Sequence, residues 1–576
     1  MTPDANLLAT FPLLKGVSRS ALRALLKGCA HYCVPSGSPL FLDKEPAQTL
    51  WFVVSGSLGA FRARLDGTSE FMGHIRQGEP VGEFALIAGE LHSNSVFALR
   101  DSEVIGIGRE AFEALIQRHT EVMTGLTRTI LFRSRTNRRT NPRAEPRVFA
   151  LLNTSPSIDI LARAQLLAGA LQGLGKTTLV AGKEAHHYNG AWFDEAERTH
   201  DIILLVSDSI GDNWAHVCQR RADRAWIFGR AETPPDFTLV EHGAAATLNV
   251  RLNDVVLVRS GQTSRTSSHA TDWKKAAAAQ RVFYWGDGDT GQLKSLARVM
   301  AGKSVGLVLG GGGARAYAHI GAVRAMREAG HSFDFVGGTS MGGVIAACLA
   351  MGWDDGEIER RIWDAFVRSS PLDDFVLPVI SLTAGRKVDR RLSENFGDTL
   401  IEALQIPFFC ASTNLTTGQT KVHEEGSLAK SLRASIALPG ILPPVVWDND
   451  VLVDGAVLNN FPVAIMRERH RGFTIGVDVT QQHALNPEDF RLPIGFFEWA
   501  FKHGLKSPPP IAELLMRAAT ASITTNMKAF MPDFLIVPQL DGVELRDWKA
   551  FDKAVEAGYT ATTRALQAMP DPLRLS

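Results

Sequence analysis

The chain has 576 residues, of which 45% are hydrophobic and 21% charged, and its 61 basic and 61 acidic residues give a formal net charge of zero. This length is enough for three or four domains, and the composition excludes a disordered or fibrous protein. The balanced charge argues against a protein whose main task is to hold nucleic acid by its phosphates. Five widely spaced cysteines without a C-x-x-C pair predict neither a disulfide framework nor a zinc site.

Membrane and export signals are absent from the sequence pattern. No apolar run reaches the roughly 18 residues that a spanning helix needs. The N-terminal residues carry Asp4 where an export signal would carry a basic residue. We therefore expect a cytoplasmic protein, and no pattern predicts a cofactor or a metal ion.

Residues 11–120 have the pattern of an antiparallel β-structure with helical edges. Strand-like runs at 50–54 and 96–99 alternate with Ser-Gly and Asp-Gly turns, which is typical of a small barrel or roll, and a helix is expected at 109–117. We place a first domain at 1–125 and a basic linker at 126–147, where Pro142 and Pro146 interrupt any helix. The linker is expected to be solvated; contact with anionic lipid headgroups is the alternative.

From residue 148 onward, strands alternate with helices, which indicates α/β layers with parallel sheets. We expect a middle α/β domain at 148–300 and a C-terminal α/β domain at 301–576 with a mostly parallel central sheet. The predicted strands lie at 148–152, 202–206, 225–228, 254–259, 305–309, 335–337, 408–412, 451–453, 475–479 and 534–537.

The strongest local signal is Gly338-Thr339-Ser340-Met341-Gly342, a G-x-S-x-G sequence between an expected strand and an expected helix. Glycines on either side let the strand and helix approach closely, while the turn projects the serine hydroxyl. This context predicts that Ser340 is a nucleophile.

A glycine-rich loop, Gly310-Gly311-Gly312-Gly313-Ala314-Arg315, lies between another expected strand and helix. Glycine amides at the start of a helix suit a developing oxyanion or a phosphate. A dinucleotide-binding loop would need an acid at the end of the next strand, where Ser340 lies instead. The oxyanion interpretation is therefore favoured.

A serine nucleophile needs a base. His319 follows the glycine loop, but a lone histidine on a helix is more often structural. Asp454 follows the expected strand 451–453 and precedes a glycine. Because α/β folds place catalytic groups at strand ends, Asp454 is the better candidate.

Together these segments resemble patatin-like phospholipases over roughly the last 270 residues. The similar segments are the glycine loop, the serine turn, Ser435-Ile436-Ala437-Leu438-Pro439-Gly440 followed by Pro443-Pro444, and Asp454-Gly455-Ala456. The resemblance implies a Ser340–Asp454 dyad that hydrolyses phospholipid or lysophospholipid esters through an acyl-enzyme. It also implies an oxyanion hole formed by Gly311, Gly312 and Gly313 with Arg315. The chain departs from the family at Ala316, where a glycine is usual.

The N-terminal part resembles a cyclic-nucleotide-binding domain. Gly82-Glu83-Phe84-Ala85-Leu86-Ile87 is similar to the start of its phosphate-binding cassette, in which Glu83 would bind the ribose. His92 stands where the cassette has the arginine that pairs with the cyclic phosphate. Because an imidazole lacks the guanidinium's bidentate contact, we expect this domain to bind another nucleotide or small ligand, or none, instead of cyclic AMP.

The whole arrangement resembles bacterial relatives of neuropathy target esterase, and the middle segment is similar to that group around residues 219–224. We therefore expect a cytoplasmic serine hydrolase that visits the inner face of the membrane and binds no nucleic acid. The main alternative is a ligand-sensing regulator whose hydrolase fold is not catalytic, as the Ala316 departure suggests. A DNA-binding regulator and a dinucleotide oxidoreductase are weaker alternatives.

Two further segments have ordinary explanations. Gly175-Lys176-Thr177-Thr178 is similar to the end of a phosphate-binding loop, but position 170 is alanine and a helix precedes it, so a helix C-cap at Gly173 or Gly175 is our interpretation. The aromatic-rich stretch 496–502 is expected to be a buried helix, with a lid or interfacial helix as the alternative.

Overall fold

The fold comes from a computed structural model, which describes residues 4–63, 69–136, 146–184, 190–237, 252–261, 267–369, 372–377, 379–480, 531–545 and 547–568. The chain forms two compact units. The first contains Met1–Gly261 and Asp272–Ala301, and the second contains Gln262–Thr271 and Gly302–Ser576.

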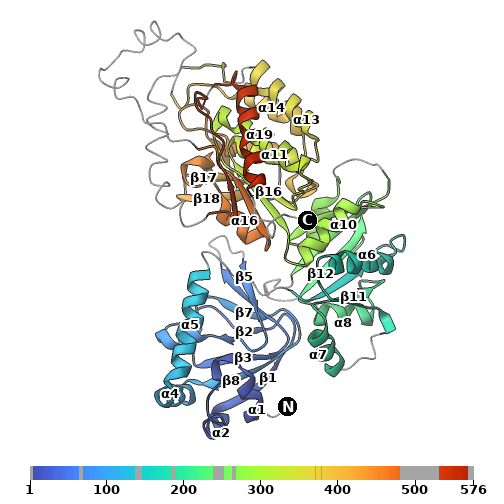
Figure 1. The fold of residues 1–576 in the computed structure, drawn as a ribbon, viewed down its shortest axis with the longest axis vertical. Coiled ribbons are helices and arrows are strands. Elements are labelled where there is room, and N and C mark those ends of the chain that lie inside the picture. Colours follow the sequence, from blue (N-terminus) through green and yellow to red (C-terminus); the bar gives the residue numbers. More distant parts are fainter. Residues whose placement is uncertain are drawn as a thin grey trace. The chain divides into compact units, whose positions relative to one another are not determined.

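The first unit begins with a β-roll of two antiparallel sheets (Figure 1). One sheet has the order β1 (Cys29–Val34), β8 (Ser102–Gly108), β3 (Thr49–Ser55), β6 (Pro80–Val81). The other has the order β2 (Pro39–Phe41), β7 (Ser95–Ala98), β4 (Leu58–Ala63), β5 (Ser69–Ile75). The helices are α1 (Ala5–Thr10), α2 (Arg19–Leu25), α3 (Glu83–Ala88), α4 (Arg109–Arg118) and α5 (Thr120–Thr136). Alternate residues of β3 and β8 are fully buried against the helices of the roll. They include Leu50, Phe52, Ile105 and Ile107.

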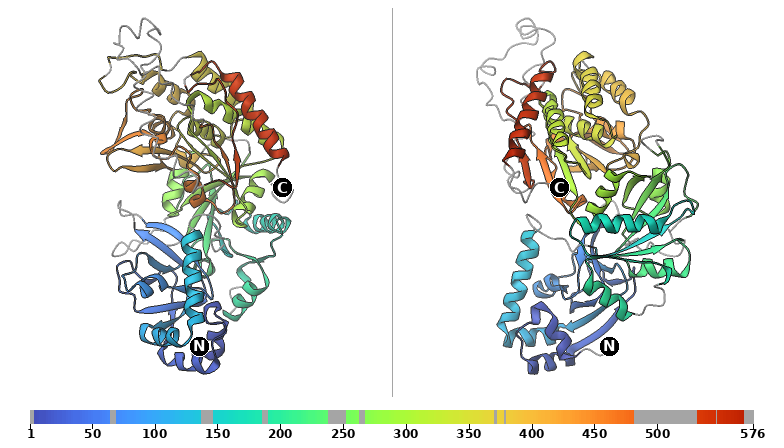
Figure 2. Two further views of the ribbon diagram at one scale, coloured as in Figure 1. Left: turned by 60° about the vertical axis from the view of Figure 1, so that its left-hand side comes forward. Right: turned by 45° about the vertical axis from the view of Figure 1, so that its right-hand side comes forward.

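A six-stranded parallel sheet completes the first unit, and all its strands except the first in the order, β10, are buried along most of their length because helices cover both faces. Helices α6 and α10 lie on one face, and α7 and α8 on the other (Figures 1 and 2). The strand order is β10 (Thr178–Ala181), β11 (Ile202–Ser207), β9 (Val148–Asn153), β12 (Arg224–Arg230), β13 (Asn253–Arg259), β14 (Arg281–Gly286). The helices are α6 (Ile160–Gly173), α7 (Gly190–Thr199), α8 (Asn213–Arg221), α9 (Ala270–Ala276) and α10 (Thr290–Met300).

A buried ion-pair cluster joins the roll to this sheet. Arg100, two residues after β7, donates to both carboxylate oxygens of Glu197 at 2.6 and 2.7 Å. Its Nε lies 3.1 Å from Asp223, whose other oxygen accepts the backbone amides of Arg147 and Val148. Because the Arg100 and Asp223 side chains are both nearly inaccessible to water, this contact is a structural joint.

The ends of two helices in the first unit can be compared with the sequence predictions. Helix α5 runs to Thr136, so the first part of the expected linker 126–147 is helical, and residues 137–145 lie outside the described ones. At the end of α6, Gly175 has a φ of +75° and its amide donates to Gln172. The glycine therefore ends a helix, as expected, where a phosphate-binding loop was the alternative.

The second unit contains a mixed sheet with a parallel centre. Strands β17, β16, β15, β21 and β22 are parallel, whereas β18, β20 and β19 run antiparallel to their neighbours. The order is β19 (Val445–Trp447), β20 (Asp450–Asp454), β17 (Phe408–Asn414), β16 (Phe335–Thr339), β15 (Val305–Leu309), β21 (Phe473–Val477), β22 (Phe534–Ile536), with β18 (Gln419–His423) also on β17. This sheet and the roll confirm the predicted fold class.

Helices pack closely on this sheet. Helices α11 and α19 lie side by side (Figure 1), and a Cβ atom added at Gly558 of α19 would overlap the carbonyl of Ala318 in α11. Small residues therefore set the distance between these helices. The helices of this unit are α11 (Ala318–Glu328), α12 (Met341–Ala350), α13 (Asp355–Ile362), α14 (Arg386–Phe396), α15 (Leu428–Ser435), α16 (Val463–Arg469) and α19 (Phe551–Gln567).

Candidate active site

Ser340 occupies a strained turn between β16 and α12. Its φ of 54° and ψ of −132° lie in a region that L-residues with side chains rarely adopt. A Cβ atom at Gly338 would lie 2.5 Å from the Leu309 carbonyl oxygen, and one at Gly342 would overlap the carbonyls of Leu309 and Gly310. The two glycines thus let α12 start directly against β15, and the turn holds Ser340 at the carboxyl edge of the sheet.

Asp454 ends β20 at the same edge and contacts Ser340. Strand β17 pairs with both β16 and β20, with Ala411 opposite Thr339 and Ser412 opposite Asp454. The Ser340 hydroxyl donates to Asp454 Oδ2 at 2.7 Å. The structure therefore brings together the two residues that the sequence predicted as nucleophile and base.

The Asp454 carboxyl lies in a low-dielectric environment. Only 1% of the residue is exposed. Burial raises the pKa of Asp454 from 3.8 to about 7, against the opposing effect of hydrogen bonds from the Ala456 amide and the Ser340 hydroxyl. A carboxylate with a pKa near neutrality can both accept a proton from a hydroxyl and return it.

The segment that begins at Ser435 holds both residues in place. The backbone amide of Ser340 donates to Ser435 Oγ at 2.9 Å, and that hydroxyl donates to the Ala411 carbonyl at 2.7 Å. The amide of Asp454 donates to the Ala437 carbonyl at 2.9 Å. Sequence reasoning recognised this motif but assigned no role to Ser435, whose only signal was its place at the start of the motif.

The glycine-rich loop passes directly beside Ser340. A Cβ atom at Gly311 would lie 3.1 Å from Ser340 Cβ. The Gly311 amide donates to the Asn460 carbonyl, and Asn460 Nδ2 donates to the Gly311 carbonyl. The Gly311 amide therefore already has a hydrogen-bond acceptor, whereas we expected all three glycine amides to face an oxyanion. Asn460, which sequence reasoning did not single out, clamps the loop.

The amides of Gly312 and Gly313 have no recorded hydrogen-bond partner among the residues that the structure describes. They stand at the start of a 3-10 turn, Gly313–Tyr317, a position at which free backbone N–H groups can bind an anion. Gly313 has a φ of 55°, and a Cβ atom there would overlap the Leu545 carbonyl. These two amides are the candidate oxyanion donors.

Arg315 and Ala316 lie on that 3-10 turn. The Arg315 guanidinium is buried and donates through Nε to the Val543 carbonyl at 2.8 Å, so this contact ties the turn to a distant segment. Ala316, where the resemblance led us to expect glycine, is fully buried in the hydrophobic core. Its methyl group is accommodated in that packing.

His319 is hydrogen-bonded to the glycine-rich loop and not to Ser340. Its Nε2 donates to the Gly310 carbonyl at 2.7 Å, and burial lowers its pKa to about 4. The imidazole is therefore neutral at physiological pH. The structure agrees with the structural role expected for this histidine.

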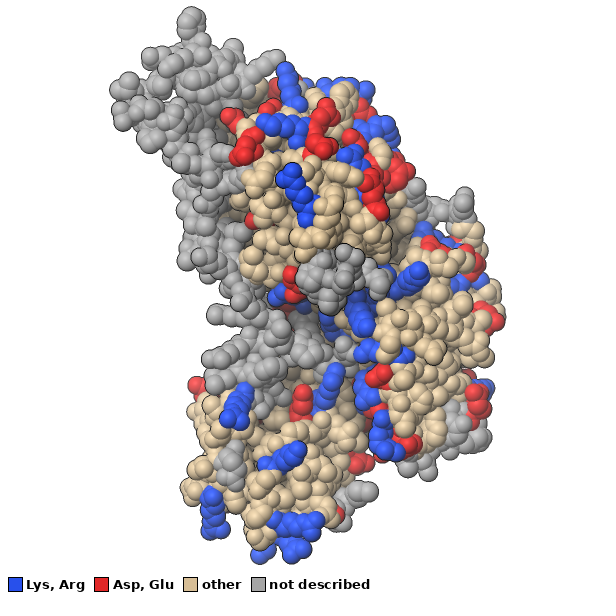
Figure 3. Space-filling view, in the orientation of Figure 1, with Lys and Arg blue, Asp and Glu red and all other residues tan. Residues whose placement is uncertain are grey.

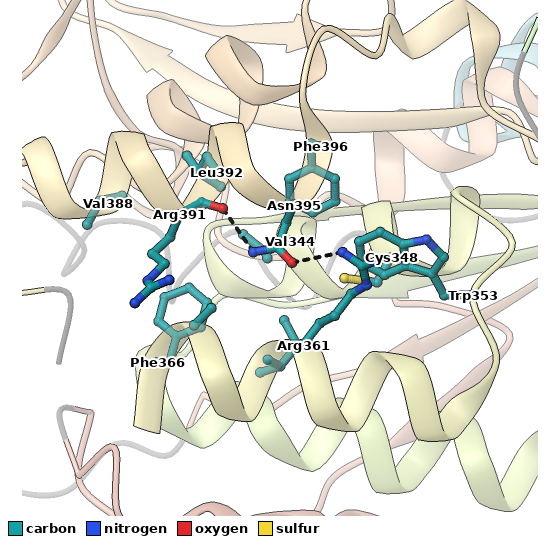
Figure 4. A pocket seen from close by; sticks show the side chains of 12 residues that line it. Val344, Cys348, Trp353, Arg361, Phe366, Val388, Arg391, Leu392, Asn395 and Phe396 are labelled. Atoms are coloured by element: carbon teal, nitrogen blue, oxygen red, sulfur yellow. Dashed lines mark hydrogen bonds between the residues drawn. The ribbon is translucent and has the colours of Figure 1, made fainter. Parts of the chain in front are cut away.

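A small apolar cavity is lined mainly by residues of α12, α13 and α14 (Figure 4). It holds about 20 Å³, roughly the space of one water molecule. Arg361 is one of its lining residues, with its guanidinium 4.3 Å from the centre of the Trp353 ring and a hydrogen bond donated to Asn395 Oδ1. Neither Ser340 nor Asp454 lines it, so this cavity as it stands is not a substrate pocket.

In the roll, His92 lies beside Gly82, the residue before Glu83, because a Cβ atom at Gly82 would lie 3.4 Å from His92 Cε1. Glu83 is buried at the start of α3. The His92 ring is also buried and stacks on Phe41 with centroids 3.7 Å apart. Burial lowers the pKa of His92, which favours a neutral ring. A neutral, stacked imidazole is a poor substitute for a phosphate-binding guanidinium.

Two sequence predictions concern membranes, and the described residues bear on one of them. Within the described part of the chain, no helix is long and apolar enough to cross a bilayer. The stretch 496–502, for which a buried helix or a lid was expected, lies outside the described residues.

Comparisons with known proteins agree with these domains. A family model described as patatin-like phospholipase matches residues 307–467, and one described as cyclic nucleotide-binding domain matches residues 33–119. Patatin-like phospholipase domain-containing protein 6 of Pongo abelii is 26% identical over 91% of this chain and 44% of its own length. Lysophospholipase NTE1 of Pyricularia oryzae is 25% identical over 93% of this chain and 42% of its own length.

A bacterial relative matches from end to end. An uncharacterized NTE family protein of Mycobacterium tuberculosis is 30% identical over 100% of this chain and 98% of its own length. With a patatin-like phospholipase domain, a cyclic-nucleotide-binding-type roll and this full-length match, the chain belongs to the NTE family.

Proposed function

We propose that this protein is a serine lipid acyl hydrolase that cleaves carboxylic esters of phospholipids or lysophospholipids through a Ser340–Asp454 dyad. The observation that carries the proposal is the 2.7 Å hydrogen bond from the Ser340 hydroxyl to a buried carboxyl whose pKa is about 7. A strained serine beside a base of near-neutral pKa is the arrangement that acyl transfer needs.

The first half of the reaction forms an acyl-enzyme. Asp454 takes the proton as Ser340 Oγ attacks the ester carbonyl carbon. The negative charge that develops on the carbonyl oxygen is stabilised by the amides of Gly312 and Gly313 at the positive end of the 3-10 turn. Asp454 then gives the proton to the leaving alcohol, so the C–O bond of the ester breaks and Ser340 keeps the acyl group.

The second half restores the enzyme. Asp454 removes a proton from a water molecule, and the resulting oxygen attacks the acyl carbon. The tetrahedral intermediate collapses, the proton passes from Asp454 to Ser340 Oγ, and a fatty acid leaves. One carboxyl thus serves as base and acid in turn, which its pKa near 7 permits in both directions.

The relatives support the proposed substrate class. The chain spans less than half of the two eukaryotic relatives above, one named a lysophospholipase and the other a phospholipase-domain protein. The region shared with them includes the patatin-like domain. We therefore propose a phospholipid or lysophospholipid substrate, reached at the cytoplasmic face of a membrane.

Labelling with a fluorophosphonate probe tests the proposal, because the probe reacts with an activated serine whatever the natural lipid. We expect labelling of the wild type and none of Ser340→Ala. Asp454→Asn should keep the fold but lose lysophospholipid hydrolysis. Absence of labelling in folded wild-type protein would favour the alternative, a regulator that uses the hydrolase fold without catalysis.

We further propose a regulatory N-terminal domain at residues 1–125, connected by residues 126–147 to the middle domain at 148–300 and the hydrolase domain at 301–576. The buried, stacked His92 supports a ligand other than cyclic AMP at the Glu83 site, or none. Calorimetric titration with cyclic AMP should give no binding heat. A measurable affinity would contradict this part of the proposal.

A further inference from the structure

One loop of the hydrolase unit exposes an unusual run of apolar side chains. Leu377, Val379 and Ile380 are 86%, 87% and 70% exposed. Phe375 and Val376 are about half as exposed. Single exposed apolar residues are ordinary, but five within six positions form a patch that usually marks an interaction site. We call these five residues the apolar loop.

Backbone hydrogen bonds fix the base of the apolar loop. Phe375 and Thr383 form an antiparallel bridge, and the Val376 amide donates to the Leu382 carbonyl. The Thr383 hydroxyl is buried and donates to the Ile441 carbonyl at 2.7 Å. The loop therefore has a fixed base, and its most exposed apolar residues, Leu377, Val379 and Ile380, lie at the tip.

The base leads directly to the candidate active site. The Leu382 and Thr383 amides donate to the carbonyls of Gly440 and Ile441. Those two residues end the segment whose beginning, at Ser435, holds the Ser340 amide. The base of the apolar loop is thus hydrogen-bonded to the segment that positions the nucleophile.

Other exposed apolar residues lie at the same edge of the sheet. Leu415 follows the carboxyl end of β17, which is parallel to β16 and so ends on the side where Ser340 lies. The Leu415 amide donates to Val451, and Val451 pairs with Val446 across β20 and β19. Leu415 and Val446 are 55% and 68% exposed. The apolar character therefore continues along the edge that carries the site.

The charge around the loop favours a lipid surface without a strict need for anionic headgroups. Asp373 forms an ion pair with Lys387, and the Lys387 amide donates to Asp374. On the face shown in Figure 3, basic and acidic side chains of the second unit are interspersed. A second protein is a poorer fit, because a specific protein interface uses roughly 20–30 residues a side.

We propose that the apolar loop inserts into the surface of a lipid bilayer or micelle and presents the Ser340 edge to it. This inference rests on the proposed hydrolase function and adds the surface through which the enzyme meets its substrate. Moving a Leu, Val or Ile side chain from water into an apolar environment is favourable in proportion to the apolar area that leaves water. Three such side chains at one tip therefore supply a sizeable membrane affinity.

Vesicle flotation tests the inference in the Ser340→Ala background, so that binding is measured without turnover. The test variant is Leu377→Ser/Val379→Ser/Ile380→Ser, and the vesicles are phosphatidylcholine. The matched control is Leu161→Ser/Leu166→Ser, which removes two exposed leucines from α6 in the other unit. We expect the test variant to bind vesicles at least about ten-fold more weakly and the control to bind like the parent protein.

A soluble short-chain ester separates this inference from the proposed function. The loop variant with Ser340 intact should hydrolyse that ester at the wild-type rate while losing activity on vesicles. Vesicle binding that is unchanged in the loop variant would overturn the inference. A change from dimer to monomer in that variant would also overturn it, since the loop would then bind a second copy. Failure of the wild type to hydrolyse the soluble ester refutes the hydrolase function alone.

Discussion

The raised pKa of Asp454 predicts how activity and stability change with pH. The base must be ionised to accept the Ser340 proton, so kcat/KM on a soluble ester should rise with pH through an apparent pKa near 7. One pH unit below that value, about a tenth of the carboxyl is ionised, and two units below, about a hundredth. The rate should fall in the same proportion.

Stability should change in the opposite direction. The folded state holds the Asp454 proton more tightly than the unfolded chain, so the free energy of unfolding falls as pH rises from the unfolded value, 3.8, to the folded value, about 7. Those three or so pH units, at about 1.4 kcal/mol each, correspond to a loss of roughly 4 kcal/mol. Asp454→Asn carries no charge and escapes this loss. Its advantage over wild type in chemical denaturation should therefore grow from acid to neutral pH.

Both measurements have a matched control. Burial also raises the pKa of Asp478, another buried carboxyl of the hydrolase unit, which accepts the Thr480 amide. Asp478→Asn should keep the acid limb of the activity profile near pH 7. The assay should use an ester whose alcohol does not ionise in this range. An activity profile that is flat between about pH 5 and 8, or a limb that disappears in Asp478→Asn, would refute the assignment of Asp454 as base.

Three substitutions test the surroundings of the site and the joints of the fold. Ser435→Ala removes the acceptor of a buried amide, so we expect kcat on a soluble ester to fall roughly ten-fold or more with little change in KM; an unchanged kcat would exclude a positioning role. Arg100→Ala removes the arginine that pairs with the buried Asp223 carboxylate and should lower the free energy of unfolding by about 3–5 kcal/mol, as measured by urea denaturation. Gly558→Val should lower the melting temperature clearly, because its side chain meets the Ala318 backbone; a wild-type value would show that α19 shifts freely.

The sequence predicted most strands because they are buried on both faces. Strands β9 and β11 are almost entirely apolar and inaccessible to water, which produces uninterrupted apolar runs that stand out between helices. The sequence predicted the ends of the strands less accurately. The strand expected to run to Val479 ends at Val477, where the chain turns toward the glycine loop. Local pattern identifies an element, whereas tertiary contacts decide where it ends.

The candidate nucleophile and base were predictable because each carries its own local signature. The hydrogen bond between them joins residues 114 positions apart, which only the fold can bring together. The engaged amide of Gly311 shows the limit of motif reasoning. Its partner Asn460 lies 149 positions away, and no periodicity or spacing connects the two. For the same reason no sequence pattern indicated the ion-pair cluster around Arg100.

The site holds two unfavourable features that the surrounding structure must maintain. A residue such as Ser340 in a sparsely populated backbone region costs roughly 1–3 kcal/mol, and a buried carboxylate at Asp454 adds a charge without a cationic partner among its recorded contacts with the described residues. The hydrogen bonds that Ser340 and Asp454 donate to Ser435 and Ala437, and the one that Asn460 donates to the Gly311 carbonyl, offset these costs by holding the turn in place. Weakening one of them should therefore relax the turn toward ordinary backbone geometry. Activity should then fall before global stability does, because relaxation of the strained turn recovers part of the free energy that the lost hydrogen bond supplied.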